Sequence, residues 1–246
     1  MSIVSDATLV STRIRGFEHE KPCHHCIVSP KPPYNCRTQG KHAQGDVIVV
    51  RYADDFVVGF QHRHEAERFL EELRERFAKF GLELHSGKTR LIEFGRFAAT
   101  NRHGRGEGKP ETFDFLGFTH ICGTTRKGKY KVIRLTIKKR LRAKLKSLKT
   151  ELRRRMHLSV PDVGEWLAMV LNGYYRYHAV PGNYQRLWAF RYHVGRLWYR
   201  ALNRRSQRSR LNWERMARII DVWLPRPRIL HPYPEQRLCL RVNNPR

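Results

Sequence analysis

Two adjacent carboxylates, Asp54 and Asp55, lie within an otherwise apolar stretch, VIVVRYADDFVVGF at residues 47–60. β-Branched and aromatic residues on both sides predict two strands joined by a tight turn. Adjacent anions repel each other unless a cation lies between them. Mg²⁺ is such a cation, and it prefers carboxylate oxygens together with phosphate ligands. The residue types therefore indicate metal-dependent phosphoryl transfer, in which two ions about 3.5–4 Å apart stabilise the attacking and leaving oxygens.

An ordinary hairpin is the alternative interpretation, because aspartate is common in turns. The elements around the pair bear on this choice. After the strand–turn–strand of residues 46–61, apolar residues at three-and-four spacing predict a helix over 63–81 that ends at Gly81. Residues 96–112 are predicted to be a polar loop. Three further strands, each rich in β-branched and aromatic residues, are predicted at 89–95, 113–121 and 130–137.

The chain changes character after residue 137, where basic residues and helical periodicity dominate. The predicted helices each combine an apolar stripe with a polar face and cover about 138–157, 161–178, 184–203 and 212–223. In the third helix, the residues expected in the core are Leu187, Phe190, Val194, Leu197 and Trp198. The remaining segments, 1–45 and 224–246, are predicted to be an irregular leader and an extended tail.

The formal net charge is +27, and residues 138–246 carry 26 basic against 6 acidic residues, a net of +20. Self-repulsion of this size favours a polyanionic partner, of which nucleic acid is the obvious one. An anionic membrane surface fits less well, because the basic helices also carry a full core-forming stripe. No apolar run could span a membrane and no signal peptide is recognisable, so we expect a cytoplasmic protein.

Cysteine usage leaves one metal question open. Cys23 and Cys26 have the spacing of a zinc knuckle, with Cys36 ten residues later and nearby histidines as candidate fourth ligands. No second pair of Cys or His follows at regular spacing. The alternative is an unrelated leader that binds no metal.

Several motifs in order resemble one family. RYADDFVVGF (51–60) resembles the Tyr-x-Asp-Asp hairpin of reverse transcriptases, and GLELHSGKTRLIEFG (81–95) and FDFLGF (113–118) follow as in group II intron reverse transcriptases. The helical region resembles the thumb and maturase region (domain X) of bacterial intron-encoded proteins. The segments that carry this second resemblance are GYYRYHAVPGN, FRYHVGRLWYRALNRRSQ, NWERM and WLPRPRILHPYP, at 173–183, 190–207, 212–216 and 223–234.

The resemblance implies an α+β fold. A partial polymerase palm of antiparallel strands and a helix would span 46–137, and an all-α, basic thumb/maturase bundle would span 138–223. The implied activity is RNA-directed DNA synthesis with two Mg²⁺ ions, together with binding of group II intron RNA and of an RNA–DNA template–primer.

Residue by residue, the resemblance makes Asp54 and Asp55 the catalytic metal ligands. The residues implied to lie near the nucleotide or the primer are Tyr52, Ala53, Lys88, Phe115, Leu116 and Gly117. The residues expected to contact RNA, on aromatic and basic surfaces outside the apolar stripes, are Arg176, Tyr177, Arg191, Arg196, Arg200, Arg204, Arg205, Arg208 and Arg210.

A polymerase palm also needs a third carboxylate, which the family carries on a strand well upstream of the hairpin. Only Asp6 and Asp46 are aspartates before the hairpin here, and neither matches the family's motif. The finger motifs are not found either. We therefore expect no polymerase activity from this chain alone, as a truncated or decayed copy or as one half of a split protein with an upstream partner. A non-catalytic RNA-binding module and a gene remnant are the alternatives.

Overall fold

The computed structural model describes residues 7–15, 45, 47–53, 55–205 and 211–233, with the backbone alone for 7–15. Helices and antiparallel strands both occur, as expected for an α+β protein. The chain divides into two compact units, Met1–Phe115 with His120–Val132, and Leu116–Thr119 with Ile133–Arg246. The division lies within two strands of a small sheet and not at residue 137, where the composition changes.

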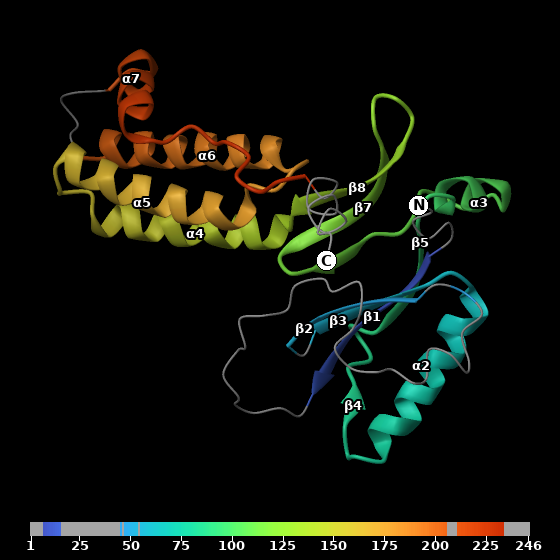
Figure 1. Ribbon diagram of the computed structural model, residues 1–246. Coiled ribbons are helices and arrows are strands. Elements are labelled where there is room, and N and C mark those ends of the chain that lie inside the picture. Colours follow the sequence, from blue (N-terminus) through green and yellow to red (C-terminus); the bar gives the residue numbers. More distant parts are fainter. Residues whose placement is uncertain (1–6, 16–44, 46, 54, 206–210, 234–246) are drawn as a thin grey trace, which may run out of the picture. The chain divides into compact units, whose positions relative to one another are not determined.

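The first unit contains an antiparallel sheet with the order β2-β3-β1, and β4 and β5 both pair with β1 on its other side (Figure 1). These strands are β1 (Ala7–Arg15), β2 (Val47–Tyr52), β3 (Asp55–Phe60), β4 (Glu83–Leu84) and β5 (Arg90–Phe94). Among the described residues, β2 pairs with β3 alone and forms an edge of the sheet.

Strand β1 lies in the middle of this sheet, so the expectation of an irregular leader over residues 1–45 was wrong for Ala7–Arg15. Leu9 is the register partner of Gly59 in β3 and of Ile92 in β5. The sequence ATLVSTRIR mixes apolar, hydroxyl and basic residues without clean alternation, which hides the strand from a local reading. Pairing with strands far away in the chain determines its conformation.

Strand β3 is buried on both of its faces. Phe56, Val58 and Phe60 pack against helix α2 (Arg63–Ala78), in a cluster that includes Ala66. On the other face, Val57 joins a separate cluster with residues of β5 and the following strands. Burial on both faces explains why the segment after Asp55 is a continuous apolar run and does not alternate with polar residues.

Two predicted boundaries in this unit differ from the structure. Helix α2 ends at Ala78, a few residues before Gly81, which has a left-handed φ of 66° in the turn that follows. A seven-residue helix, α3 (Ala98–Gly104), lies inside the predicted loop 96–112, so that prediction was wrong there. Ion pairs support this short helix, because Arg105 pairs with Glu93 and Glu107. The contact with Glu93, which lies twelve residues away, leaves no periodic signal in the sequence.

A smaller sheet follows with the order β6-β7-β8. Its strands are β6 (Phe113–Phe115), β7 (Phe118–Thr124) and β8 (Tyr130–Thr136). The single strand predicted over 113–121 is interrupted by a tight turn at Leu116 and Gly117, both of which have positive φ.

The second unit is mainly helical, and its helices are α4 (Lys138–Arg154), α5 (Val160–His178), α6 (Tyr184–Asn203) and α7 (Trp213–Trp223). In Figure 1, α4, α5 and α6 lie alongside one another. All four predicted helices are confirmed. In the predicted core, Leu187, Phe190 and Val194 are fully buried and Trp198 is 1% exposed, whereas Leu197 is half-buried and packs against this core. Within the described residues, no helix has the length and apolar character needed to cross a membrane.

Asn183 joins the start of α6 to the end of β8 through a buried amide. Its Oδ1 accepts a hydrogen bond from the Thr136 N–H at 3.0 Å. Its Nδ2 donates to Thr136 Oγ1 and to the carbonyl of His178, both at 2.8 Å. The side chain is fully buried, as is Thr136, so the Thr136 N–H and hydroxyl would lose their partner inside the core if the amide were removed.

We expect Asn183→Ala to lower the free energy of unfolding by about 3 kcal/mol, because it leaves several buried donors and acceptors unpaired. Urea denaturation followed by circular dichroism measures this change. The control Asn172→Ala removes an exposed amide from α5 and should change stability by less than about 0.5 kcal/mol. Equal effects of the two substitutions would contradict the assigned role.

Candidate functional site

The Asp-Asp hairpin is a two-residue turn, because Tyr52 at the end of β2 is the register partner of Asp55 at the start of β3. Ala53 has φ 52°, which a non-glycine residue seldom adopts but which two-residue hairpin turns require. Arg51 Nε donates to the Ala53 carbonyl at 3.0 Å and supports this conformation. Asp55 is half-buried and Tyr52 is exposed, whereas Asp54 lies outside the described residues.

The strand beside the hairpin carries no carboxylate. The register partner of Asp55 in β1 is Arg13, and the whole strand, ATLVSTRIR, contains neither Asp nor Glu. Among the residues that the structure describes, no group of three or more His, Cys, Asp or Glu could hold a metal ion. The described residues therefore do not fit the carboxylate set of a two-Mg²⁺ centre, which needs ligands from more than one strand.

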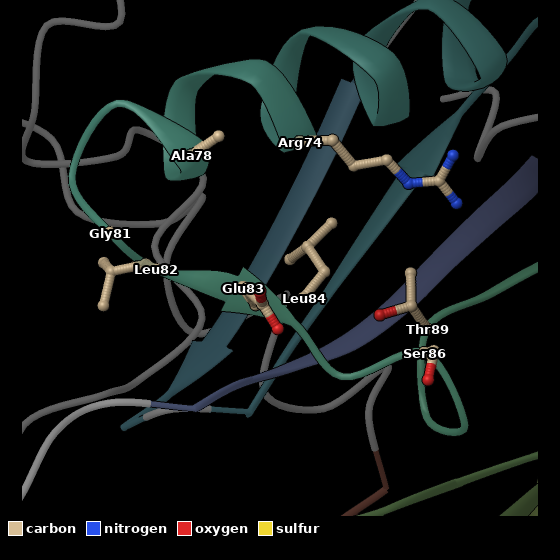
Figure 2. Close-up of a pocket in the computed structure, with 8 residues that line it drawn as sticks. All are labelled: Arg74, Ala78, Gly81, Leu82, Glu83, Leu84, Ser86 and Thr89. Carbon is tan, nitrogen blue, oxygen red and sulfur yellow. The ribbon is translucent and has the colours of Figure 1, made fainter.

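Lys88 lies on an exposed loop between β4 and β5, where its N–H donates to the His85 carbonyl at 2.9 Å. A hollow of about 500 Å³ lies next to this loop and is lined by residues of α2, β4 and the loop. Figure 2 shows Arg74 extending from α2 toward the side on which Ser86 and Thr89 lie. Lys88 does not line this hollow, so its predicted role near the nucleotide stays a prediction.

The turn between β6 and β7 brings together residues from two predicted groups. Tyr177 of α5 donates its hydroxyl proton to the Leu116 carbonyl at 2.8 Å. Leu116 has φ 46°, and a strained non-glycine residue of this kind is often found at functional sites. Gly117 follows with φ 81°, and a Cβ there would lie 3.2 Å from the Arg140 guanidinium. Only glycine therefore suits this position without displacing a neighbour.

Aromatic rings cover the same turn within the second unit. The ring of Phe118 stacks on Tyr177 with 5.8 Å between centroids. His178 stacks on Tyr174 at 4.0 Å, and its Nδ1–H donates to the Tyr174 carbonyl at 3.1 Å. Burial lowers the pKa of His178, the hydrogen bond partly offsets this effect, and the charge of Arg140 lowers the pKa further. An uncharged imidazole therefore supports this turn.

One of the predicted RNA-contacting arginines is buried inside the helical unit. Arg191 is 7% exposed, and its guanidinium donates to the carbonyls of Ile220 and Leu224 and to Asp221 Oδ1, at 3.0–3.2 Å. It therefore pairs with the Leu224 carbonyl that follows α7, and it adds a second donor to the Ile220 carbonyl, which already accepts from the Leu224 N–H. These contacts occupy the side chain that was expected to reach RNA.

Of the other residues predicted to contact RNA, some are exposed and the rest lie outside the described residues. The exposed residues are Arg176, Tyr177, Arg196, Arg200, Arg204 and Arg205. Arg205 donates to the Leu158 carbonyl at 2.9 Å. Arg208 and Arg210 lie outside the described residues, as do the zinc-ligand candidates Cys23, Cys26 and Cys36.

Sequence reasoning missed Arg140 and His178 at the β6–β7 turn. Both residues lie in basic or aromatic segments whose composition was recognised, namely 138–157 and 173–183. Their spacing along the chain gives no indication that they approach a turn more than twenty residues away. Only the packing of α4 and α5 against the turn reveals it.

Comparison with known protein families finds a match, which covers the first part of the chain. Residues 28–120 match the family model described as reverse transcriptase (RNA-dependent DNA polymerase). The match includes the hairpin, Lys88 and the Leu116–Gly117 turn, and it begins upstream of residue 46, where the resemblance was expected to begin. It covers less than half of the chain and ends before the first basic helix. No curated protein that was compared matches the chain. Over this region, then, the chain is similar to reverse transcriptases.

We expect the His178 environment to make stability depend on pH. Because folding lowers the pKa of this group, its contribution is present above the ordinary histidine pKa of about 6.5. That contribution is lost as the pH falls through the folded-state pKa, because the unfolded chain takes up the proton more readily. Thermal melts from pH 7.5 downward should show a smaller decline for His178→Gln than for the natural chain. Parallel curves would contradict this assignment, and His193→Gln, an exposed histidine on α6, is the control.

Proposed function

We propose that the chain is part of a group II intron-encoded reverse transcriptase/maturase and that, on its own, it binds RNA without synthesising DNA. In this proposal, residues 46–137 correspond to the polymerase palm, and 138–223 to the thumb and domain X. The family match over residues 28–120 supports the first half. The order of motifs in the helical region supports the second half.

The observation that carries the proposed inactivity is the pairing of β3 with β1. The strand adjacent to Asp55 supplies an arginine at the partner position and no carboxylate along its length. Asp54 and Asp55 on one turn could bind a single Mg²⁺ weakly, but they do not fix two ions without a ligand from another strand. An upstream fragment that supplied the missing carboxylate would be the partner needed for synthesis.

The basic helical unit supports RNA as the partner. Residues 138–246 have a net charge of +20, and the Lys and Arg side chains of α4 are almost all exposed. Guanidinium and ammonium groups bind phosphates and release condensed counterions, which provides affinity without sequence preference. Intron RNA and an RNA–DNA template–primer both present such a backbone.

We expect no primer extension when the folded chain is given an RNA template, a DNA primer, deoxynucleotides and Mg²⁺, because the described strands beside the hairpin supply no further carboxylate. Gel analysis of the labelled primer detects synthesis at single-nucleotide level. Extension that is abolished by Asp55→Ala would overturn the proposed inactivity. The matched control Asp114→Ala changes a carboxylate of the first unit in β6.

RNA binding should be steeply salt-dependent, with affinity falling roughly a thousandfold or more between about 50 and 200 mM salt. Fluorescence anisotropy of a labelled RNA measures this slope. Asp55→Ala should leave the affinity unchanged, because the affinity comes from the basic unit. A flat salt response would contradict a binding mode based on phosphate contacts.

A further inference from the structure

Helix α6 carries a row of residues spaced by four that was not recognised as a unit in the sequence. Three aromatic residues come first and three arginines follow, in the order Tyr184, Trp188, Tyr192, Arg196, Arg200 and Arg204, the last of which is the C-cap residue of the helix. Residues four apart are neighbours on a helix surface, so the row forms one continuous ridge along the helix. The row passes from the border of the core face, where Trp188 is half-buried, to the exposed face at the arginines.

The row is accessible, although half of it is aromatic. Tyr184 is 44% exposed and Tyr192 is 50% exposed, whereas Trp188 is half-buried. The three arginines are exposed. Helix α6 contains no Asp or Glu, and among the described residues no carboxylate pairs with any of these arginines. Their charges are therefore available to an anionic ligand.

Two neighbouring pairs of the row are in contact. The rings of Tyr184 and Trp188 meet edge to face, with 6.2 Å between their centroids. The guanidinium of Arg196 lies 5.7 Å from the centre of the Tyr192 ring, and its Nη1 donates to the tyrosine hydroxyl at 3.4 Å. The last aromatic residue of the row is therefore in contact with the first arginine.

Aromatic faces and arginines in one row match the chemistry of single-stranded nucleic acid. Bases stack on aromatic rings whatever their identity, and arginine contacts the phosphates. Helix stabilisation by neighbouring side chains is the simpler explanation, but it does not account for two half-exposed tyrosines on a surface where solubility favours charged residues.

The spacing of the row favours an extended strand over a duplex. Four residues of α-helix rise by about 6 Å, so successive rings present themselves at about that interval. Successive nucleotides of a duplex strand are only about 3.4 Å apart along the duplex axis. Bases that stack on successive rings must therefore be spread apart, which an unpaired strand allows and a duplex does not.

We propose that this row binds an extended, unpaired strand of nucleic acid, with bases on the aromatic half and phosphates on the arginine half. This inference rests on the proposed RNA-binding function and names the form of RNA that this surface selects. A single-stranded DNA segment shares the same chemistry, so the experiment includes both.

The experiment measures anisotropy of labelled oligouridine, oligothymidine and an RNA duplex of equal length with the full chain. The aromatic variant carries Tyr184→Leu, Trp188→Leu and Tyr192→Leu. A second variant carries Tyr192→Leu alone, so that an effect can be measured without replacing the half-buried Trp188. The matched control is Tyr233→Leu, which removes a tyrosine of equal exposure, 50%, outside α6. Near-ultraviolet circular dichroism and thermal melts verify that each variant is folded.

The triple aromatic variant should lose affinity for oligouridine by at least about fivefold for each stacked base, with an unchanged salt slope and unchanged duplex affinity. Replacing the three arginines by glutamine should make the salt slope shallower by about 0.7 for each phosphate that an arginine no longer neutralises, whereas Arg76→Gln in α2 should not. If the natural chain binds oligothymidine more weakly than oligouridine, the row selects RNA. If it binds both equally, the row accepts any unpaired strand.

Wild-type affinity of the aromatic variants for oligouridine would overturn this inference while leaving the proposed function intact. Equal losses for oligouridine and the duplex would also overturn it, because the row would then not distinguish unpaired strands. No RNA binding by the natural chain at low salt would overturn both proposals together.

Discussion

Strand β3 is held on every side, and the first unit depends on that constraint. It pairs with β1 and β2 along its two edges and packs against α2 on one face and the β5 cluster on the other. The turn before Asp55 is therefore fixed by a strand that has neighbours on both edges and both faces. What such a turn can do chemically depends on the neighbouring strand, and there the residue at the partner position is Arg13. Among the described residues, the rigid turn therefore lies beside a strand that carries no carboxylate.

In the helical unit, most basic side chains are exposed and a few polar side chains are buried in the core. A chain this basic repels itself, and the apolar residues of α4–α7 provide the opposing stabilisation. Asn183 and Arg191 enter the core with hydrogen-bond partners for their polar groups. The same residue type consequently has two roles: Arg191 completes the end of α7, whereas Arg196 and Arg200 remain outside. Composition reveals how many arginines there are but not which of them face solvent.

Local periodicity was sufficient for the helices, because each apolar stripe is long and meets a single core. It failed for β1 and for α3, whose conformations depend on strand pairing and ion pairs with distant residues. The hairpin was predictable from apolar runs on both sides of two aspartates. The contact between Tyr177 and Leu116 was not, because it joins residues 61 positions apart. Recognising each motif separately does not indicate which motifs meet in space.

The edge strand β2 has a consequence for handling the protein. It exposes Ile48, Val49 and Tyr52, at 45–52%, with Arg51 as its only charged residue. A strand of this kind tends to pair with a second copy, and mutual repulsion between highly cationic chains opposes that pairing. Salt weakens this repulsion by screening, and salt also displaces bound RNA. A high-salt wash that strips nucleic acid from the purified chain therefore also promotes aggregation through β2, so the cleanest preparations are the least colloidally stable.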